Sequence, residues 1–118
     1  MDATIEHLTD ASFADAVSEG ITVIDFWAAW CGPCRAMAPQ FERAAQLRPQ
    51  YRFAKVDVDA EPALASRYAI RSIPTLMVLR DGEPIAAQAG LIGAEALVEA
   101  LDRLAAAGTE TAGARKAA

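Results

Sequence analysis

The sequence predicts an α/β fold in which a central mixed five-stranded sheet is flanked by four helices. Three observations lead to this fold class. The chain has 118 residues, which suits one domain with a hydrophobic core of its own. Along it, short segments with strand periodicity alternate with longer segments of helical periodicity. In the last third, Asp81-Gly82 separates two apolar runs and is typical of a β-hairpin, so the last two strands should pair antiparallel.

The N-terminal part contains the predicted central strand. Residues 3–8 alternate between apolar and polar side chains, and Thr9 or Asp10 can cap the helix that follows this first strand. Residues 21–27 are apolar on both faces, as a strand covered by helices on both sides requires, and Asp25 is the only exception. A long helix is predicted from Pro33 to about residue 47 because apolar residues recur there at helical spacing.

Inside that long helix, Pro39 removes one backbone donor and should kink the axis. The next segment, 52–59, alternates as a strand, and Pro62 can open a short helix after it. The hairpin strands follow, and residues 93–106 form the last amphipathic helix. We expect one domain over residues 1–106 and a disordered C-terminal tail over 107–118.

Composition and charge disfavour two classes of partner. The chain is 53% hydrophobic but has no apolar run of about 18 residues, so no membrane role is expected. With 11 basic and 16 acidic residues and no stripe of Lys and Arg, it is not expected to bind nucleic acid. The first ten residues lack the basic start and apolar core of a secretory signal, so a cytoplasmic location is expected.

The only two cysteines, Cys31 and Cys34, are three positions apart. A structural disulfide is disfavoured because a loop of about four residues stabilises a fold by only about 2 kcal/mol, against about 4.7 for a hundred-residue loop. A metal site is disfavoured as well, since structural zinc needs four ligands and the chain adds only one histidine, His7. Both alternatives stay open, and redox chemistry is the favoured interpretation.

The two thiols have different predicted roles. Cys31 precedes the long helix, where unpaired N–H groups and the positive end of the helix dipole stabilise a thiolate, so it is the expected nucleophile. Cys34 lies one turn inside, should be more buried, and is expected to resolve the mixed disulfide. Between them, Gly32 permits the tight turn and Pro33 stiffens the helix start.

The isolated acid of the central strand, Asp25, is a candidate proton acceptor. Burial in an apolar strand should raise its pKa, which suits it to accept the proton of Cys34 near neutral pH. The alternative is a structural aspartate that nearby hydrogen bonds satisfy.

Residues 27–34, W-A-A-W-C-G-P-C, resemble the active-site signature of the thioredoxin family, W-A-x-W-C-G-P-C. The resemblance covers about residues 4–105 and implies the thioredoxin fold. It places Asp25 on the family's buried aspartate and Lys55 on the lysine near it, where Lys55 would tune the carboxyl. From alternation alone, Lys55 would be a solvated lysine.

The resemblance also implies a substrate-binding surface. Ile73 and Pro74 fall on the family's cis-proline loop, which lies against the two cysteines in thioredoxins. Together with Trp30 and Gly90 they would form an apolar surface around the nucleophile, although each of them alone is more typical of a core or a turn.

Function follows from the resemblance as an expectation. A thioredoxin is a protein-disulfide reductase, a thiol-disulfide oxidoreductase that acts on disulfide-containing target proteins and is re-reduced by thioredoxin reductase at the expense of NADPH. It needs no bound cofactor beyond its redox-active disulfide, serves electron transport and cell redox homeostasis, and is expected to be a monomer. Two alternatives are a thiol oxidase or isomerase, which Pro33 disfavours because oxidising relatives usually have histidine there, and a non-catalytic docking module.

Overall fold

The computed structural model describes the backbone of residues 5–117 and the side chains of residues 5–107. Its elements follow the predicted order. They are β1 (Glu6–His7), α1 (Asp10–Ala16), β2 (Ile21–Trp27), α2 (Gly32–Leu47), β3 (Arg52–Asp57), α3 (Pro62–Arg67), β4 (Thr75–Arg80), β5 (Glu83–Ala89) and α4 (Ala94–Ala117).

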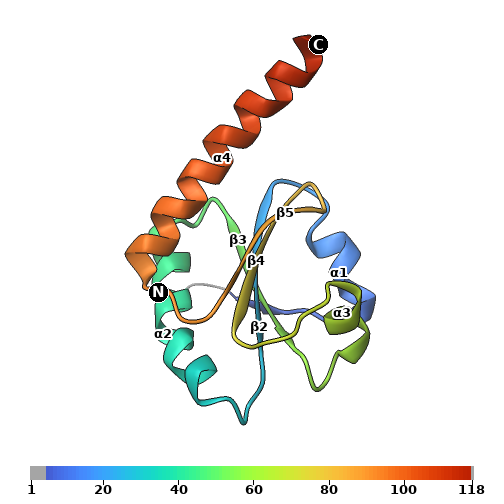
Figure 1. Cartoon of the computed structure of the whole chain (residues 1–118), viewed down its shortest axis with the longest axis vertical. Coiled ribbons are helices and arrows are strands. Elements are labelled where there is room, and N and C mark those ends of the chain that lie inside the picture. Colours follow the sequence, from blue (N-terminus) through green and yellow to red (C-terminus); the bar gives the residue numbers. More distant parts are fainter. Residues whose placement is uncertain (1–4, 118) are drawn as a thin grey trace.

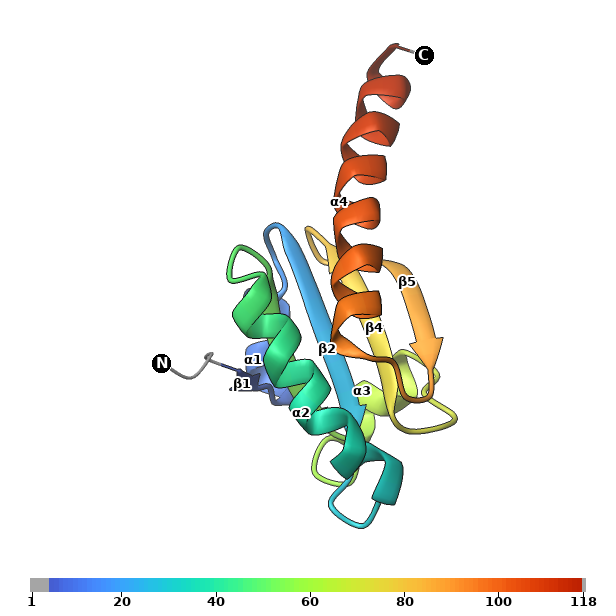
Figure 2. The ribbon, with the colours of Figure 1, turned by 90° about the vertical axis from the view of Figure 1, so that its left-hand side faces the viewer.

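The five strands form one mixed sheet in the order β1-β3-β2-β4-β5. The pairs β1 with β3 and β2 with β3 are parallel, whereas β2 with β4 and β4 with β5 are antiparallel. Helices α2 and α4 cover one face of the sheet and α1 and α3 the other, as Figures 1 and 2 show. The predicted mixed sheet with helices on both faces is confirmed.

The central position of β2 explains why both of its faces are apolar. Val23 and Ile24 are fully buried on opposite faces, each in a separate core cluster. Val23 packs with Met37 and Phe41 of α2, and Ile24 packs with residues of α1 and α3 such as Phe13. Side chains alternate along a strand, so every second residue of β2 faces α2.

Local signals fix where the helices begin. Thr9 caps α1 through a capping box with Ser12, so of the two predicted candidates, Thr9 and Asp10, the first is the cap. Pro62 stands at the first position of α3, as predicted. At the start of α4, the backbone N–H of Ala94 donates to Oε1 of Gln40 on α2 at 2.9 Å. The side chain of Gln40 thus supplies a cap that sequence alone did not indicate.

Two elements have other bounds than the sequence predicts. Strand β1 comprises Glu6–His7 and is shorter than the predicted segment 3–8, of which residues 3 and 4 lie outside the described residues. Helix α4 runs Ala94–Ala117 and so covers most of the segment expected as a disordered tail. That segment is rich in alanine, which has the highest helix propensity, and the end of α4 extends beyond the body of the domain (Figure 1). The domain boundary at residue 106 stays a prediction.

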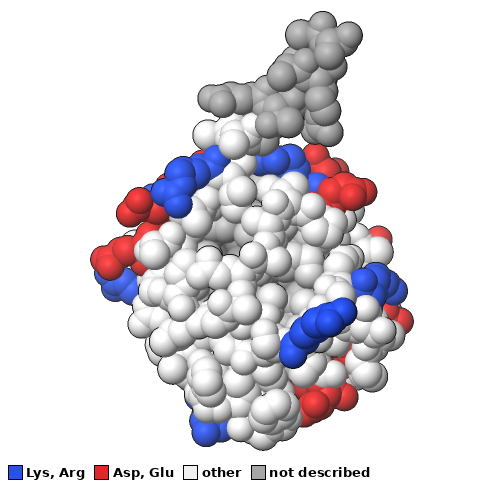
Figure 3. Space-filling view, in the orientation of Figure 1, with Lys and Arg blue, Asp and Glu red and all other residues white. Residues whose placement is uncertain are grey.

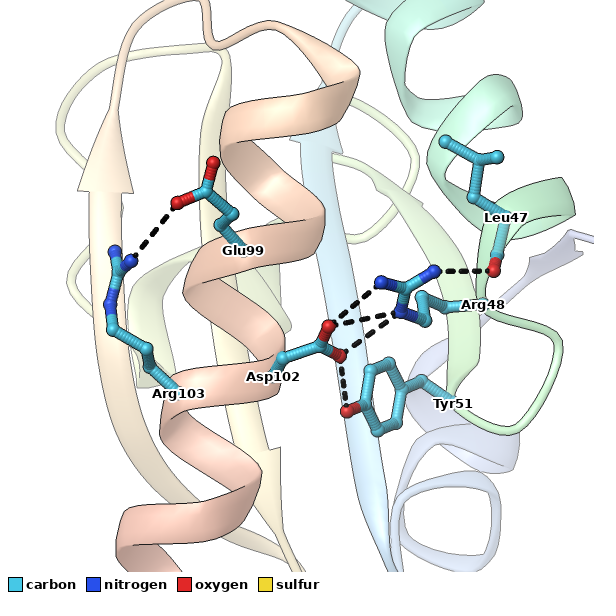
Figure 4. A network of polar contacts seen from close by, with 6 residues as sticks. All are labelled: Leu47, Arg48, Tyr51, Glu99, Asp102 and Arg103. Carbon is cyan, nitrogen blue, oxygen red and sulfur yellow. Dashed lines mark hydrogen bonds and ion pairs between the residues drawn. The ribbon is translucent and has the colours of Figure 1, made fainter.

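A polar network joins the end of α2 to α4 (Figure 4). Nη2 of Arg48, just after α2, lies 2.8 Å from Oδ2 of Asp102, and the Tyr51 hydroxyl donates to Oδ1 of Asp102 at 2.8 Å. The hydrogen bonds from Arg48 and then Tyr51 hold the pKa of the Asp102 carboxyl below its usual range. The network fixes α4 against the helix that carries the cysteines.

Candidate active site

Cys31 and Cys34 form a disulfide at the start of α2, with their Cα atoms 5.2 Å apart. Cys31 is the N-cap residue of the helix, and Cys34 lies in its first turn. Pro33 stands within that turn, where its missing N–H leaves no helical hydrogen bond unmade. The cysteine pair therefore lies at the helix end that sequence reasoning assigned to it.

The electrostatic difference between the two sulfurs arises from the helix start. Sγ of Cys31 accepts a hydrogen bond from the backbone N–H of Cys34 at 3.2 Å, in the place of a capping side-chain oxygen. A sulfur in this position also meets the positive end of the helix dipole. Both interactions stabilise negative charge on Cys31 once the disulfide opens.

Burial does not distinguish the two cysteines in the closed disulfide. The expected difference in burial is marginal in this state, because Cys31 is 4% exposed and Cys34 is 3% exposed. The reason is tertiary: Val58 and Ile73, from two other parts of the chain, pack against the buried cluster that Ala28 forms with the two cysteines. The asymmetry between the thiols lies in hydrogen bonding rather than in solvent contact.

Asp25 is fully buried, and its two carboxyl oxygens have no hydrogen-bond partner among the described residues. Burial raises the pKa of Asp25 from 3.8 to about 6, because desolvation of the carboxylate outweighs the opposing attraction of Lys55. Asp25 has the same orientation as Val23 and therefore faces α2, the helix that carries Cys34. The unpartnered carboxyl argues against an aspartate held by nearby hydrogen bonds.

Lys55 is the cross-strand partner of Asp25 on β3 and is half-buried rather than solvated. Its ammonium lies 5.5 Å from the ring centroid of Trp27, over the aromatic face, and this cation–π contact holds the charge near the sheet. The positive charge lowers the pKa of Asp25 against the effect of burial. Lys55 thus acts on the carboxyl through space, without a hydrogen bond to it.

The loop before β4 brings a third part of the chain to the disulfide. The Ile73–Pro74 peptide bond is cis, as the resemblance implied, and the carbonyl oxygen of Ile73 lies 3.8 Å from Sγ of Cys31. The N–H of Gly90 donates to the carbonyl oxygen of Pro74 at 2.8 Å, with Gly90 in the left-handed region at φ 95°. Cys31, Ile73, Pro74 and Gly90 therefore form one connected patch.

Trp30, which precedes Cys31, is 68% exposed. Its indole N–H donates to Oδ2 of Asp59 at 2.7 Å, which orients the ring although most of it faces solvent. Sequence reasoning missed Asp59, because nothing in the alternating segment 52–59 marks one of its acids as a partner of a distant tryptophan. A pocket beside the ring is lined mainly by apolar side chains, among them Val58, Ile70 and Ile73.

The family model for thioredoxin matches residues 4–103. The chain belongs to the thioredoxin family. Similar relatives include thioredoxins of Staphylococcus aureus from strains Mu50 / ATCC 700699, MW2 and N315. Each is 43% identical over 100 residues, which are 84% of this chain and 96% of the relative. Membership of the thioredoxin family and the disulfide between Cys31 and Cys34 make the chain a thiol-disulfide oxidoreductase that reduces protein disulfides.

Members of the thioredoxin family need no bound cofactor, because the two sulfurs themselves carry the electrons. Within residues 5–107, no three His, Cys, Asp or Glu side chains cluster closely enough to hold a metal ion. In the part of the chain that the structure describes, no helix is long and apolar enough to cross a membrane.

Proposed function

We propose that Cys31 and Cys34 reduce target disulfides by two successive exchanges. The Cys31 thiolate attacks one sulfur of the target disulfide, a bond forms between these two sulfurs, and the other target sulfur leaves as a thiolate that takes up a proton. Cys34 then loses its proton and attacks Sγ of Cys31, which restores the Cys31–Cys34 disulfide and releases the second target sulfur. The target gains two electrons, and the protein loses two.

One observation supports this division of roles above others. The N–H of Cys34 donates to Sγ of Cys31 at the N-cap of α2, so charge on Cys31 is stabilised where it is needed for attack. Gly32 and Pro33 belong to the same catalytic turn, because they set the backbone path between the two sulfurs.

Asp25 is the proposed acceptor of the Cys34 proton. A buried carboxyl with its pKa raised to about 6 is ionised at neutral pH and is a stronger base than a solvated one. Lys55, opposite Asp25 on β3, tunes this basicity through its charge. The experiment that separates this role from a structural one is a pH profile: Asp25→Asn should slow the resolving step most strongly above pH 6. Equal turnover for variant and parent across pH 6–9 would rule out the acceptor role.

Target proteins are proposed to dock on the apolar surface formed by Trp30, Ile73, Pro74 and Gly90, which surrounds the nucleophile. We further propose that thioredoxin reductase recharges the disulfide with electrons from NADPH. The protein would act as a monomer in the cytoplasm, in electron transport and cell redox homeostasis.

Trapping mixed disulfides tests the proposal. A Cys34→Ser variant, reduced and then mixed with oxidised target proteins in a cell extract, should retain covalent adducts on Cys31 that dithiothreitol releases. The matched Cys31→Ser variant should retain none. Adducts that form equally on both variants would contradict the assignment of Cys31 as the nucleophile.

Two further measurements separate the alternatives. Biological function retained after both cysteines are replaced by serine would favour a docking module over electron transfer. In a glutathione redox buffer, a reductase should remain oxidised under conditions in which a thiol oxidase is already reduced.

A further inference from the structure

Two large apolar side chains remain exposed beside the redox disulfide. Trp30 is 68% exposed and Leu91 is 56% exposed, and they are the two most exposed large apolar residues among those described. Trp30 precedes Cys31 in the chain. Leu91 follows Gly90, whose N–H is bonded to the carbonyl oxygen of Pro74 at 2.8 Å. Both residues therefore adjoin the patch that contains Cys31.

The exposure of Leu91 is imposed by its neighbours. On one side, Gly90 is tied to Pro74 by its backbone hydrogen bond. On the other, Ile92 is packed against the core between the sheet and the helices α2 and α4, and the N–H of Ala94 is bonded to Gln40. With the residues before and after it fixed, Leu91 projects outward in a constrained segment, which lowers the entropy that a contact to it would cost.

The surroundings of Leu91 are uncharged. The segments 73–79 and 84–93 contain no Lys, Arg, Asp or Glu. Figure 3 shows the result on one face of the molecule, where a broad area over β4 and β5 carries no charge and the charged side chains lie around it. A carboxylate or ammonium group brought against this surface would lose water without gaining a partner.

We propose that Leu91 is a specificity-determining residue that contacts an apolar side chain of the target close to its disulfide. This rests on the proposed function, since the occupant is fixed by Cys31: whatever covers this surface productively must present a disulfide sulfur to it. A target segment with an apolar residue near one cysteine can place that sulfur at Cys31 and cover Leu91 at the same time. A polar or acidic residue in that position leaves Leu91 exposed or is itself desolvated.

A panel of peptides with one intramolecular disulfide tests the proposal. One position is varied at a time among the three on either side of one cysteine, and it carries either leucine or serine. The rate constant for reduction by the reduced protein is measured for every peptide. With the parent protein, leucine should react about fivefold faster than serine at one or two positions, which corresponds to partial burial of a few methylene groups. With Leu91→Ala this preference should fall below about twofold.

Leu47→Ala is the matched control, because Leu47 is also an exposed leucine, at 40%, but stands at the opposite end of α2 from the cysteines. It should keep the parent's preference. The proposal is overturned if Leu91→Ala keeps the leucine preference in full, if it slows leucine and serine peptides equally, or if the parent has no preference. It is overturned as well if the parent sediments as a dimer and Leu91→Ala as a monomer, since a second copy would then cover the surface. A parent that reduces no peptide at all contradicts the proposed function instead.

Discussion

Replacing Asp25 by asparagine tests the electrostatics of the site through protein stability. The carboxyl is fully buried, has no hydrogen-bond partner among the described residues, and has its pKa raised from 3.8 to about 6. In the unfolded chain the same carboxyl is surrounded by water and keeps its ordinary pKa. The folded protein therefore binds this proton more tightly than the unfolded chain does, and the two states respond differently to pH.

The sign of the effect follows from the two pKa values. Below pH 3.8 the Asp25 carboxyl is protonated in both states and adds no pH dependence. Between 3.8 and about 6 the unfolded chain releases the proton while the folded protein keeps it, so the free energy of unfolding falls as pH rises. Above about pH 6 the folded protein bears the full free-energy cost of the ionised, buried carboxyl. The difference of about two between the folded and unfolded pKa values corresponds to about 3 kcal/mol.

Urea denaturation of the oxidised parent and of Asp25→Asn between pH 4 and pH 8 measures this cost. At pH 8 the variant should be more stable by about 1 to 3 kcal/mol, because a buried amide without partners offsets part of the gain. At pH 4 the advantage should vanish. Asp15→Asn is the control, since it removes the same charge from an exposed side chain and should change stability by less than about 0.5 kcal/mol. A stability difference between parent and Asp25→Asn that is the same at every pH would refute the reasoning.

Two further predictions concern Lys55 and the polar network around Asp102. Lys55→Met should raise the pKa of Asp25 above about 6, because it removes the charge that opposes desolvation. Carboxyl ¹³C NMR of the oxidised protein measures this midpoint, and an unchanged value would contradict the tuning role. Asp102→Asn should destabilise the fold at pH 7, because hydrogen bonds from Arg48 and Tyr51 lower the pKa of Asp102 in the folded state. The stabilisation by the ionised Asp102 carboxyl is fully present above pH 3.8 and is lost as pH falls through its lowered pKa in the folded state. If Asp102→Asn lost as much stability at pH 2 as at pH 7, this result would be evidence against the explanation.

Much of the fold could be predicted because its signals are local. Residues 21–27 carry mainly apolar side chains on both faces, as a central strand requires, and β2 takes the central position in the sheet. Asp81-Gly82 predicted a hairpin, and both residues have positive φ, at 49° and 85°, between the antiparallel strands β4 and β5. Thr9 and Pro62 marked helix starts because a cap or a missing N–H acts within one turn.

The site was predicted unevenly. The spacing of Cys31 and Cys34 in the sequence indicated redox chemistry, and the isolation of Asp25 in an apolar strand indicated its desolvation. By contrast, alternation alone made Lys55 a solvated lysine, whereas the structure places it half-buried over Trp27. The position of the Lys55 side chain depends on the neighbouring strand β2 and on the cation–π contact with Trp27, which the alternation of residues along β3 cannot indicate.

Contacts between distant segments lay beyond the sequence pattern. Asp102 is joined to Arg48, 54 positions away, and the acids of an amphipathic helix look alike in the sequence until their neighbours are known. The same holds for Asp59, whose hydrogen bond orients the ring of Trp30. The burial of Cys31 also depends on distant segments, since Val58 and Ile73 pack against the cluster that contains it.

The sequence by itself determined the order and type of the strands and helices, the close spacing of the two thiols, and that one acid would lie in an apolar strand, because periodicity, capping and thiol spacing act over a few residues. Only the tertiary structure decided how acidic Asp25 is, what packs around Cys31, and that Leu91 stands exposed next to Gly90. Desolvation and through-space charge are sums over segments that meet only when the sheet assembles, so no single stretch of the chain contains them.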